Sequence, residues 1–304
     1  MKNILVWVKA ARLRTLPLAF AASGSGNLLA SYSPHFQWTI AILSILTTLL
    51  LQILSNFAND LGDSIQGADH AGRKGPKRAV QSGELTKTAM QKAVLILAFL
   101  SLISGSILLW ICFGNDLKKI TPLFALGLFS IAAAYFYTNG KKPYGYQALG
   151  DISVFTFFGF VAVFGTQYLH TGDIGMSGFP LAMAMACWST AVLNINNMRD
   201  IDSDQMAGKE TIPTKLGLEK AKVYHYVIVS IGILSMLYFG IQQSDRAFLL
   251  AIPGVVLIIK STRGVSLSQT SFQMDANLRT QALGTFICVA GVVVFKIIKA
   301  LLFL

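Results

Sequence analysis

The chain has 304 residues, of which 54% are hydrophobic and only 13% are charged, and its mean hydropathy is +0.58. Because a soluble globular domain carries about a quarter of its residues as charges, this composition argues against a soluble enzyme and excludes a disordered chain. The net charge of +11 suits either nucleic-acid binding or the loops of a membrane protein, so the positions of the charges decide between them.

Nine apolar segments approach the roughly twenty residues that a helix needs to cross a bilayer. They lie at 13–31, 36–58, 89–113, 120–138, 148–169, 177–198, 223–241, 246–262 and 280–301. Open β structure cannot satisfy its backbone in lipid, and the segments are too long and continuous for barrel strands. The sequence therefore predicts an all-α integral membrane protein with about nine transmembrane helices in a single membrane domain, 1–304.

The basic residues indicate the orientation of this protein in the membrane. With nine spans, the N-terminus and every second loop share one face, and that face holds 20 of the 25 Lys and Arg. The positive-inside rule places this face, with the N-terminus and the large loops, in the cytoplasm. We expect a protein of the cell (inner or plasma) membrane with no nucleic-acid partner. A cleaved signal peptide at the first span is the less favoured alternative.

Acidic residues gather in two segments of the same face, which hold nine of the 14, at 60–84 and 200–219. In the first segment, Asn59, Asp60 and Asp63 follow Asn56 by three, four and seven residues at the end of the second predicted helix. That spacing places all four side chains on one helix face. In the second segment, Asp200 and Asp204 are four residues apart and again share a face.

The two acidic segments look like copies of one unit. A shift of 141 residues places Asn56 on Asn197, Asn59 on Asp200, Asp63 on Asp204 and Gly67 on Gly208. We expect parallel repeats at about 10–140, with an acidic motif at 56–69, and at about 148–262, with an acidic motif at 194–208, before a final helix at about 280–301. Because an even number of helices separates the motifs, both emerge on the same face and can meet across a central cavity.

Concentrated carboxylates repel one another unless a cation neutralises them, and hard oxygen ligands favour Mg²⁺, which also binds substrate phosphates. The pattern therefore indicates a diphosphate bridged by Mg²⁺. Side chains suited to the remaining phosphate oxygens are Lys77, Arg78, Arg199 and Lys209, while Arg73 and Lys74 are equally explained by anchoring at the membrane surface. The alternative for the acidic segments is a solvated loop at a helix end.

The paired motifs Asn59-Asp60-x-x-Asp63 and Asp200-x-x-x-Asp204 resemble those of the UbiA superfamily of intramembrane aromatic prenyltransferases. Shorter strings are similar to the 1,4-dihydroxy-2-naphthoate polyprenyltransferases of menaquinone synthesis: Arg14-Thr-Leu-Pro-Leu-Ala-Phe20, Lys142-Pro-Tyr-Gly-Tyr146 and Leu149-Gly-Asp151-Ile-Ser. The resemblance runs from about residue 10 to 220. Many relatives carry a third aspartate where this chain has Gly67, so Asp69 is the candidate replacement.

The resemblance implies a UbiA-type helix bundle in which two Mg²⁺ ions bind a polyprenyl diphosphate, with the lipid tail in a groove open to the bilayer. The implied metal ligands are Asp60, Asp63, Asp69, Asp200 and Asp204, and Asn56 and Asn59 join the basic residues at the diphosphate. Ionisation of the allylic carbon–oxygen bond leaves a cation that needs an apolar, water-poor chamber. No obligate protein partner is indicated.

The acceptor in the resembled branch is 1,4-dihydroxy-2-naphthoate, which is prenylated at its carboxyl-bearing carbon with loss of CO₂, giving demethylmenaquinone. Candidates for binding it are Lys141, Lys142, Tyr144 and Asn197, and Asp151 is a candidate catalytic residue for a phenolic proton. A helix N-terminal aspartate stabilised by the helix dipole explains Asp151 almost as well. The alternatives are another UbiA-type acceptor, such as 4-hydroxybenzoate, or a membrane transporter.

Overall fold

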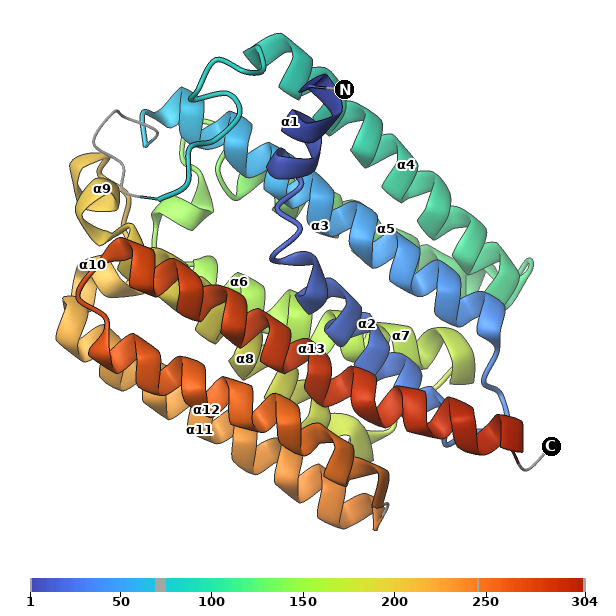
Figure 1. Cartoon of the computed structure of the whole chain (residues 1–304). Coiled ribbons are helices and arrows are strands. Elements are labelled where there is room, and N and C mark those ends of the chain that lie inside the picture. Colours follow the sequence, from blue (N-terminus) through green and yellow to red (C-terminus); the bar gives the residue numbers. More distant parts are fainter. Residues whose placement is uncertain (1, 69–74, 245, 303–304) are drawn as a thin grey trace.

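The computed structural model describes residues 2–68, 75–244 and 246–302, and in this part of the chain it contains helices and no β-strand. Figure 1 shows long helices lying side by side in one bundle. They are α1 (Lys2–Ala10), α2 (Leu16–Ala30), α3 (Trp38–Gln66), α4 (Lys87–Phe113), α5 (Leu117–Phe136), α6 (Gly150–Val154), α7 (Ala162–Thr171), α8 (Phe179–Arg199), α9 (Ile201–Met206), α10 (Ile212–Leu216), α11 (Leu218–Gln243), α12 (Ile252–Leu267) and α13 (Ser271–Leu302). Four shorter helical segments are η1 (Tyr144–Tyr146), η2 (Phe155–Val161), η3 (Met176–Gly178) and η4 (Arg246–Ala251).

Eight helical stretches within the described residues are long and apolar enough to cross a membrane, so the protein is a multi-pass membrane protein. The remaining predicted span corresponds to α2, whose 15 residues reach about 22 Å and fall short of a bilayer core of about 30 Å. Most of α2 is buried, and it packs against α3, α7 and α13. A helix enclosed by its neighbours in this way does not have to match the bilayer thickness.

The two ends of the chain differ from the sequence prediction. The N-terminus forms a separate helix, α1, and a turn at residues 11–15 separates it from α2. The last helix begins at Ser271 and not near residue 280. Thr270 accepts a hydrogen bond from the Gln273 backbone amide, and the Gln273 side chain accepts one from the Thr270 amide. This capping box starts α13 in a polar stretch that hydropathy alone excludes.

The fifth predicted span is one continuous helical stretch with a π-helical segment in its middle. α6 leads into η2, which has π-helical geometry from Phe155 to Val161, and η2 leads into α7. A π turn holds more residues than an α turn and commonly occurs near functional sites. Phe157, Phe158 and Val161 of this segment line the internal cavity described below.

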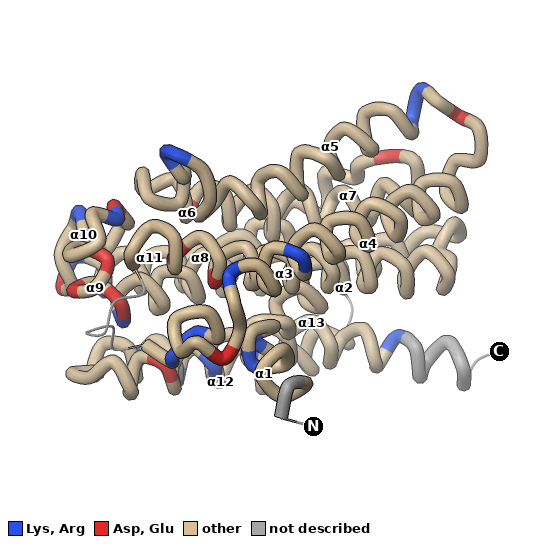
Figure 2. Tube along the Cα trace, turned by 90° about the horizontal axis from the view of Figure 1, so that it is seen from above, with Lys and Arg blue, Asp and Glu red and all other residues tan. Residues whose placement is uncertain are grey.

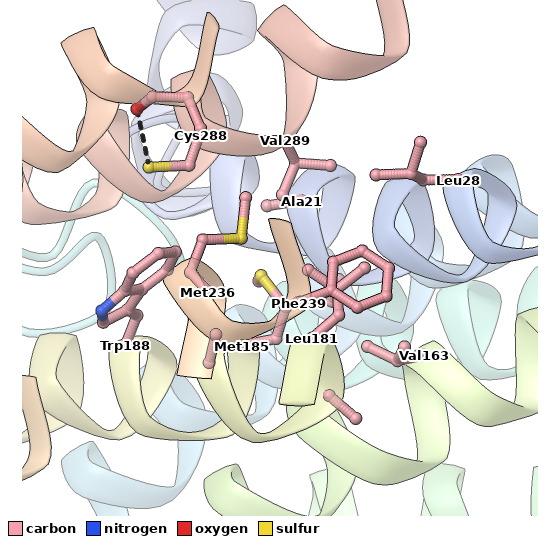
Figure 3. Close-up of a cluster of buried hydrophobic side chains, with 14 of the residues drawn as sticks. Ala21, Leu28, Val163, Leu181, Met185, Trp188, Met236, Phe239, Cys288 and Val289 are labelled. Carbon is pink, nitrogen blue, oxygen red and sulfur yellow. Dashed lines mark hydrogen bonds between the residues drawn. The ribbon is translucent and has the colours of Figure 1, made fainter. Parts of the chain in front are cut away.

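The largest apolar core lies where α2, α7, α8, α11 and α13 meet (Figure 3). Trp188, Met185 and Leu181 of α8 are fully buried, and Phe239 of α11 packs among them. At Gly232 of α11, an added Cβ would collide with the Trp188 ring, so the two helices approach closely at this point. The packing fixes α8, whose last turn carries the second acidic segment.

Charged residues gather at one end of the bundle, which we call the charged end (Figure 2). This end carries α9 and α10, and the long helices between the two ends carry few charges. The distribution agrees with apolar helices in lipid and loops in water, because a charge in the bilayer core is costly. The acidic segments therefore lie at the edge of the membrane-spanning region.

Candidate active site

The first acidic segment, taken with its motif at 56–69, is described up to Ala68, and its residues 56–66 form the last turns of α3. The helix ends at Gly67, whose φ of +80° lies in the left-handed region that glycine adopts readily, and the Gly67 amide donates to the Asp63 carbonyl. Asn56, Asp60 and Asp63 are buried, with 4% or less of each residue exposed. The predicted helix face is therefore present. Asp69, Arg73 and Lys74 lie outside the described residues.

The loop that follows α3 folds back over these carboxylates. The Asp60 carboxylate accepts hydrogen bonds from the backbone amides of Ala79 and Val80, at 3.1 and 3.4 Å. Arg78 forms an ion pair with Asp63 and also donates to the Asn59 carbonyl. Buried carboxylates need compensation of this kind, since an isolated buried charge is very costly. The first segment is thus neutralised by a loop that lies close to it in sequence.

The second acidic segment, residues 194–208, spans a break between two helices. α8 ends at Arg199 and α9 begins at Ile201, while the Asp204 amide still donates to the Asp200 carbonyl at 2.8 Å. Asp200 and Asp204 therefore remain one helical turn apart, in agreement with their spacing. Both are buried, with 4% of each residue exposed.

Asp200 is held by the residue directly before it. Arg199 donates to both Asp200 carboxylate oxygens, at 2.9 and 2.8 Å, and to the Asn196 side chain at 2.8 Å. The same guanidinium donates to Asp275 of α13 at 2.7 Å. Asp275 also pairs with Arg14 and with Arg279. Asp275 therefore joins the N-terminal turn, the second acidic segment and the last helix.

Asp204 has weaker compensation than the other three aspartates. Its Oδ1 atom lies 3.5 Å from the Lys209 ammonium, and its buried Oδ2 atom has no hydrogen-bond partner among the residues that the structure describes. Burial raises the pKa of Asp204 to about 6, against the opposing effect of Lys209. An orphaned carboxylate oxygen at this position is suited to a bound cation.

Tyr146 connects the two acidic segments. Its hydroxyl donates to Asp63 at 2.6 Å, and the Lys209 ammonium lies 5.4 Å from the centre of its ring. Burial and the neighbouring Asp63 raise the pKa of Tyr146 well above its ordinary value, so the hydroxyl stays protonated as a donor. The backbone holds the same contact, because the Glu210 amide donates to the Tyr146 carbonyl and the Ala148 amide donates to the Glu210 carbonyl.

A cavity of about 370 Å³ opens between these segments and extends along the helices. Its polar end is lined by Asn56, Asn59, Asp63, Arg78, Asn197 and Lys209. The rest of the wall is mostly apolar with scattered Ser and Thr side chains, comes mainly from α3, α4, α5, η2, α7 and α8, and includes Leu109, Phe124, Phe157, Phe158 and Leu169. A ligand with a charged head and an apolar tail fits this division.

The donor set fits a Mg²⁺ site. No group of three His, Cys, Asp or Glu side chains lies in metal-binding arrangement in the described part of the chain. Mg²⁺ does not require one, since it usually binds one or two carboxylates, several waters and substrate phosphates. Asp63 at the polar end of the cavity and Asp204, with its orphaned oxygen, supply carboxylates from both segments.

The other candidates from the sequence are divided between the cavity and the surface. Tyr144 lines the cavity together with Asn197. Lys77, Lys141 and Lys142 are exposed and are not among the residues that line it. Asp151 is buried and accepts a hydrogen bond from Tyr224 of α11 at 2.9 Å, while the cavity wall is formed by the next residues of its span, Ser153 and Val154.

Sequence reasoning missed Asp275, and it considered Tyr146 only as an aromatic face for the allylic cation and not as a partner of Asp63. Asp275 lies outside both acidic segments, and its signal in the sequence is a lone carboxylate four residues before Arg279 at the start of an apolar helix. Tyr146 stands in a noticed string, but its pairing with Asp63 joins residues 83 positions apart. Local spacing does not encode a contact of that range.

Comparisons with known proteins agree with this architecture. The family model "UbiA prenyltransferase family" matches residues 16–275. The 1,4-dihydroxy-2-naphthoate octaprenyltransferase of Haemophilus influenzae is 40% identical over 258 residues, covering 83% of each chain. A UbiA homologue from Aeropyrum pernix superposes with a TM-score of 0.71 at 18% identity, covering 92% of this chain and 98% of that one.

A second solved structure is a UbiA homologue from Archaeoglobus fulgidus, described as bound to GPP and Mg²⁺. It superposes with a TM-score of 0.61 at 16% identity, covering 93% of this chain and 99% of that chain. At such low identity both structures show the common fold, and the family model covers most of the sequence. The chain belongs to the UbiA prenyltransferase family.

Proposed function

We propose that the protein transfers a polyprenyl group from a polyprenyl diphosphate to 1,4-dihydroxy-2-naphthoate. The observation that carries this proposal is the meeting of two acidic segments at the polar end of an elongated, mostly apolar cavity. The relative from Haemophilus influenzae, named for this reaction and 40% identical, supports the choice of acceptor. The Archaeoglobus fulgidus homologue, bound to GPP and Mg²⁺, supports the prenyl donor and the metal.

Mg²⁺ would be held by Asp63 and Asp204, with Asp60 and Asp200 beside them, and we propose two ions. When bound, the metal supplies positive charge that stabilises the departing diphosphate. Arg78 and Lys209 pair with Asp63 and Asp204 here. With those carboxylates neutralised, the two cationic side chains are left to donate to diphosphate oxygens, and Asn56 and Asn59 line the same end of the cavity. Arg199 is buried in its contacts with Asp200 and Asp275 and is not among the residues that line the cavity.

The reaction breaks the allylic carbon–oxygen bond, and its electron pair leaves with the diphosphate. A new carbon–carbon bond forms at the carboxyl-bearing carbon of the acceptor, whose carboxylate then departs as CO₂ and returns its electron pair to the ring. The product is the hydroquinone form of demethylmenaquinone. The chain's contribution to this step is an apolar wall that excludes water from the allylic cation, with Phe157 and Phe158 of η2 facing the cavity.

We further propose that the charged end faces the cytoplasm and that the protein resides in the cell membrane. The distribution of Lys and Arg supports this orientation through the positive-inside rule. The two acidic segments each follow the end of a long helix, α3 and α8, at the same end of the bundle. This common direction supports parallel repeats at about 10–140 and 148–262. We also propose that Asp151, two residues before Ser153 of the cavity wall, acts on a phenolic proton of the acceptor.

A direct assay tests the function. Purified protein in lipid with Mg²⁺ and a polyprenyl diphosphate is given either 1,4-dihydroxy-2-naphthoate or 4-hydroxybenzoate, and prenylated product and CO₂ are measured together. Product that depends on the naphthoate, with an equal amount of CO₂, is the expected result. Product with 4-hydroxybenzoate alone would move the protein to another acceptor, and no product from either would contradict the proposal.

A further inference from the structure

The cavity wall carries a basic residue from the turn between α1 and α2. Among the described residues, three cationic side chains line the cavity: Arg12, Arg78 and Lys209. Arg78 and Lys209 lie beside the carboxylates of Asp63 and Asp204, whereas Arg12 belongs to the turn between α1 and α2. A role for Arg12 toward the acceptor rests on the proposed function, because that function requires the cavity to hold the acceptor carboxylate in addition to the diphosphate.

The turn that carries Arg12 is fixed firmly to α3. The Asn56 side-chain amide donates to the Ala11 carbonyl at 2.9 Å and to the Thr15 hydroxyl at 3.3 Å. The Thr15 hydroxyl in turn donates to the Arg12 carbonyl at 3.0 Å. Arg12 has a φ of +52°, in the left-handed region that is unfavourable for a non-glycine residue. Such conformations persist where surrounding contacts hold them, and they cluster at binding sites.

The position of this turn along α3 suits a ligand next to the diphosphate. Asn56 and Asp63 are seven residues apart on one helix, which corresponds to about 10 Å along its axis. The turn that carries Arg12 therefore contacts α3 about two helical turns before Asp63, next to the polar end of the cavity. In the proposed reaction the attacked ring carbon bears the carboxylate, so this carboxylate must lie just beyond the allylic carbon.

A hydrogen-bond acceptor lies beside the same turn. Gln52 precedes Asn56 by one turn of α3 and also lines the cavity. Its side-chain Nε2 donates to the Asn56 Oδ1 atom at 3.5 Å, while its buried Oε1 has no hydrogen-bond partner within the described part of the chain. A buried acceptor without a donor is uncommon and costly. A phenolic hydroxyl on a bound ring supplies the missing donor.

We propose that Arg12 binds the carboxylate of the aromatic acceptor and that Gln52 accepts a hydrogen bond from its ring hydroxyl. The turn at residues 11–15 is then the part of the chain that selects an aromatic hydroxy acid. Lys141 and Lys142, the cations first suggested by the sequence for this carboxylate, are exposed and absent from the cavity wall.

Two inhibitors that differ only in a carboxylate test the role of Arg12. Inhibition constants for 1-hydroxy-2-naphthoate and 1-naphthol are measured on the purified enzyme, and their ratio reports the contribution of the carboxylate. Arg12→Asn removes the charge and retains a residue that tolerates positive φ. The ratio is expected to fall at least tenfold in this variant, while KM for the prenyl diphosphate stays unchanged.

Matched variants separate Arg12 from general charge effects. Lys9→Gln removes a nearby exposed cation of α1 and is expected to preserve the ratio, as is the double variant Lys141→Gln with Lys142→Gln. Arg12→Lys retains a charge and is expected to keep part of the discrimination. A ratio that falls in the lysine double variant and survives in Arg12→Asn would overturn the proposal.

Gln52 provides an independent check because both inhibitors carry the hydroxyl. Gln52→Met is expected to weaken both inhibitors by a similar factor and to leave their ratio unchanged. Should the wild-type protein form no product from the naphthoate, the proposed function fails. Calorimetric binding of the two compounds to the same protein then still tests Arg12, and equal affinities in wild type and Arg12→Asn would refute its role.

Discussion

The two acidic segments occupy equivalent positions in the proposed repeats, yet the structure supports them in different ways. Asp60 and Asp63 are compensated by a loop that begins only a few residues later, through two backbone amides and Arg78. Asp200 is compensated by Arg199, which is anchored by Asp275, 76 residues further along the chain. The basic side chain that compensates the first segment is therefore close in sequence, whereas the one that compensates the second is anchored by the last helix.

The largest expected effect comes from removing a carboxylate from either segment. Asp63→Asn or Asp204→Asn should lower turnover by about 10³-fold or more, because several kcal/mol of stabilisation of the leaving group depend on the metal ligands. Initial rates on purified variants measure this. Asp173→Asn, at an exposed position between α7 and α8, is the matched control and should leave the rate unchanged. Near wild-type activity in either aspartate variant contradicts a site shared by both segments.

Removal of Mg²⁺ should lower turnover about as much as the loss of a carboxylate, because both acidic segments would lose their metal at once. Treatment with a chelator is expected to reduce prenyl transfer to background, and added Mg²⁺ should restore it. Because a ligand that binds only the folded state stabilises it, the thermal midpoint in the presence of a prenyl diphosphate should also rise with Mg²⁺. Turnover that persists in excess chelator would argue against a metal at the acidic segments.

Asp275→Asn should impair the second segment and spare the first. Losing charge-assisted hydrogen bonds to Arg199 costs about 1.5–3 kcal/mol, or about 10- to 100-fold in turnover, with a higher Mg²⁺ concentration needed for half-maximal rate. The control is Arg279→Gln, which removes an exposed partner of Asp275 and leaves Arg14 and Arg199 in place. If both variants behave alike in a Mg²⁺ titration, Asp275 has only a structural role.

The smallest effect is expected for the link between the segments. Tyr146→Phe removes one hydroxyl from Asp63, which keeps its pairing with Arg78, so turnover should fall by about tenfold or less. Kinetics over a range of Mg²⁺ concentrations, with thermal unfolding as a check on folding, give the measurement. An unchanged rate at every Mg²⁺ concentration would show that the segments do not need this hydrogen bond.

Much of this architecture could be predicted from the sequence. Hydropathy located the membrane helices in the correct order, and helical spacing placed Asn56, Asp60 and Asp63 on one face, because both signals are local. The start of α13 was hidden by polar residues that a capping box accommodates. The partners of the carboxylates were hidden for a different reason: Tyr146 and Asp275 reach them only through tertiary packing.

The acceptor side shows the limit of reading charge from sequence alone. Lys141 and Lys142 were candidates for the acceptor carboxylate, and Lys142 begins one of the strings that carry the resemblance, yet both side chains are exposed. Arg12 was not a candidate for this carboxylate, because in the sequence it is one of several basic residues before the first span. The difference between these cations lies in the turn at residues 11–15, which the Asn56 side chain holds against α3.

The π-helical segment η2 has a consequence for changes in chain length. An α-helix advances about 100° per residue, so deleting one residue normally rotates every later side chain to a different face. A π turn already contains an additional residue, and its removal restores α geometry while the flanking helices keep their register. Residues 155–161 are therefore the place where this span can lose one residue with Asp151 and Thr166 still in position, at the cost of reshaping the wall formed by Phe157 and Phe158.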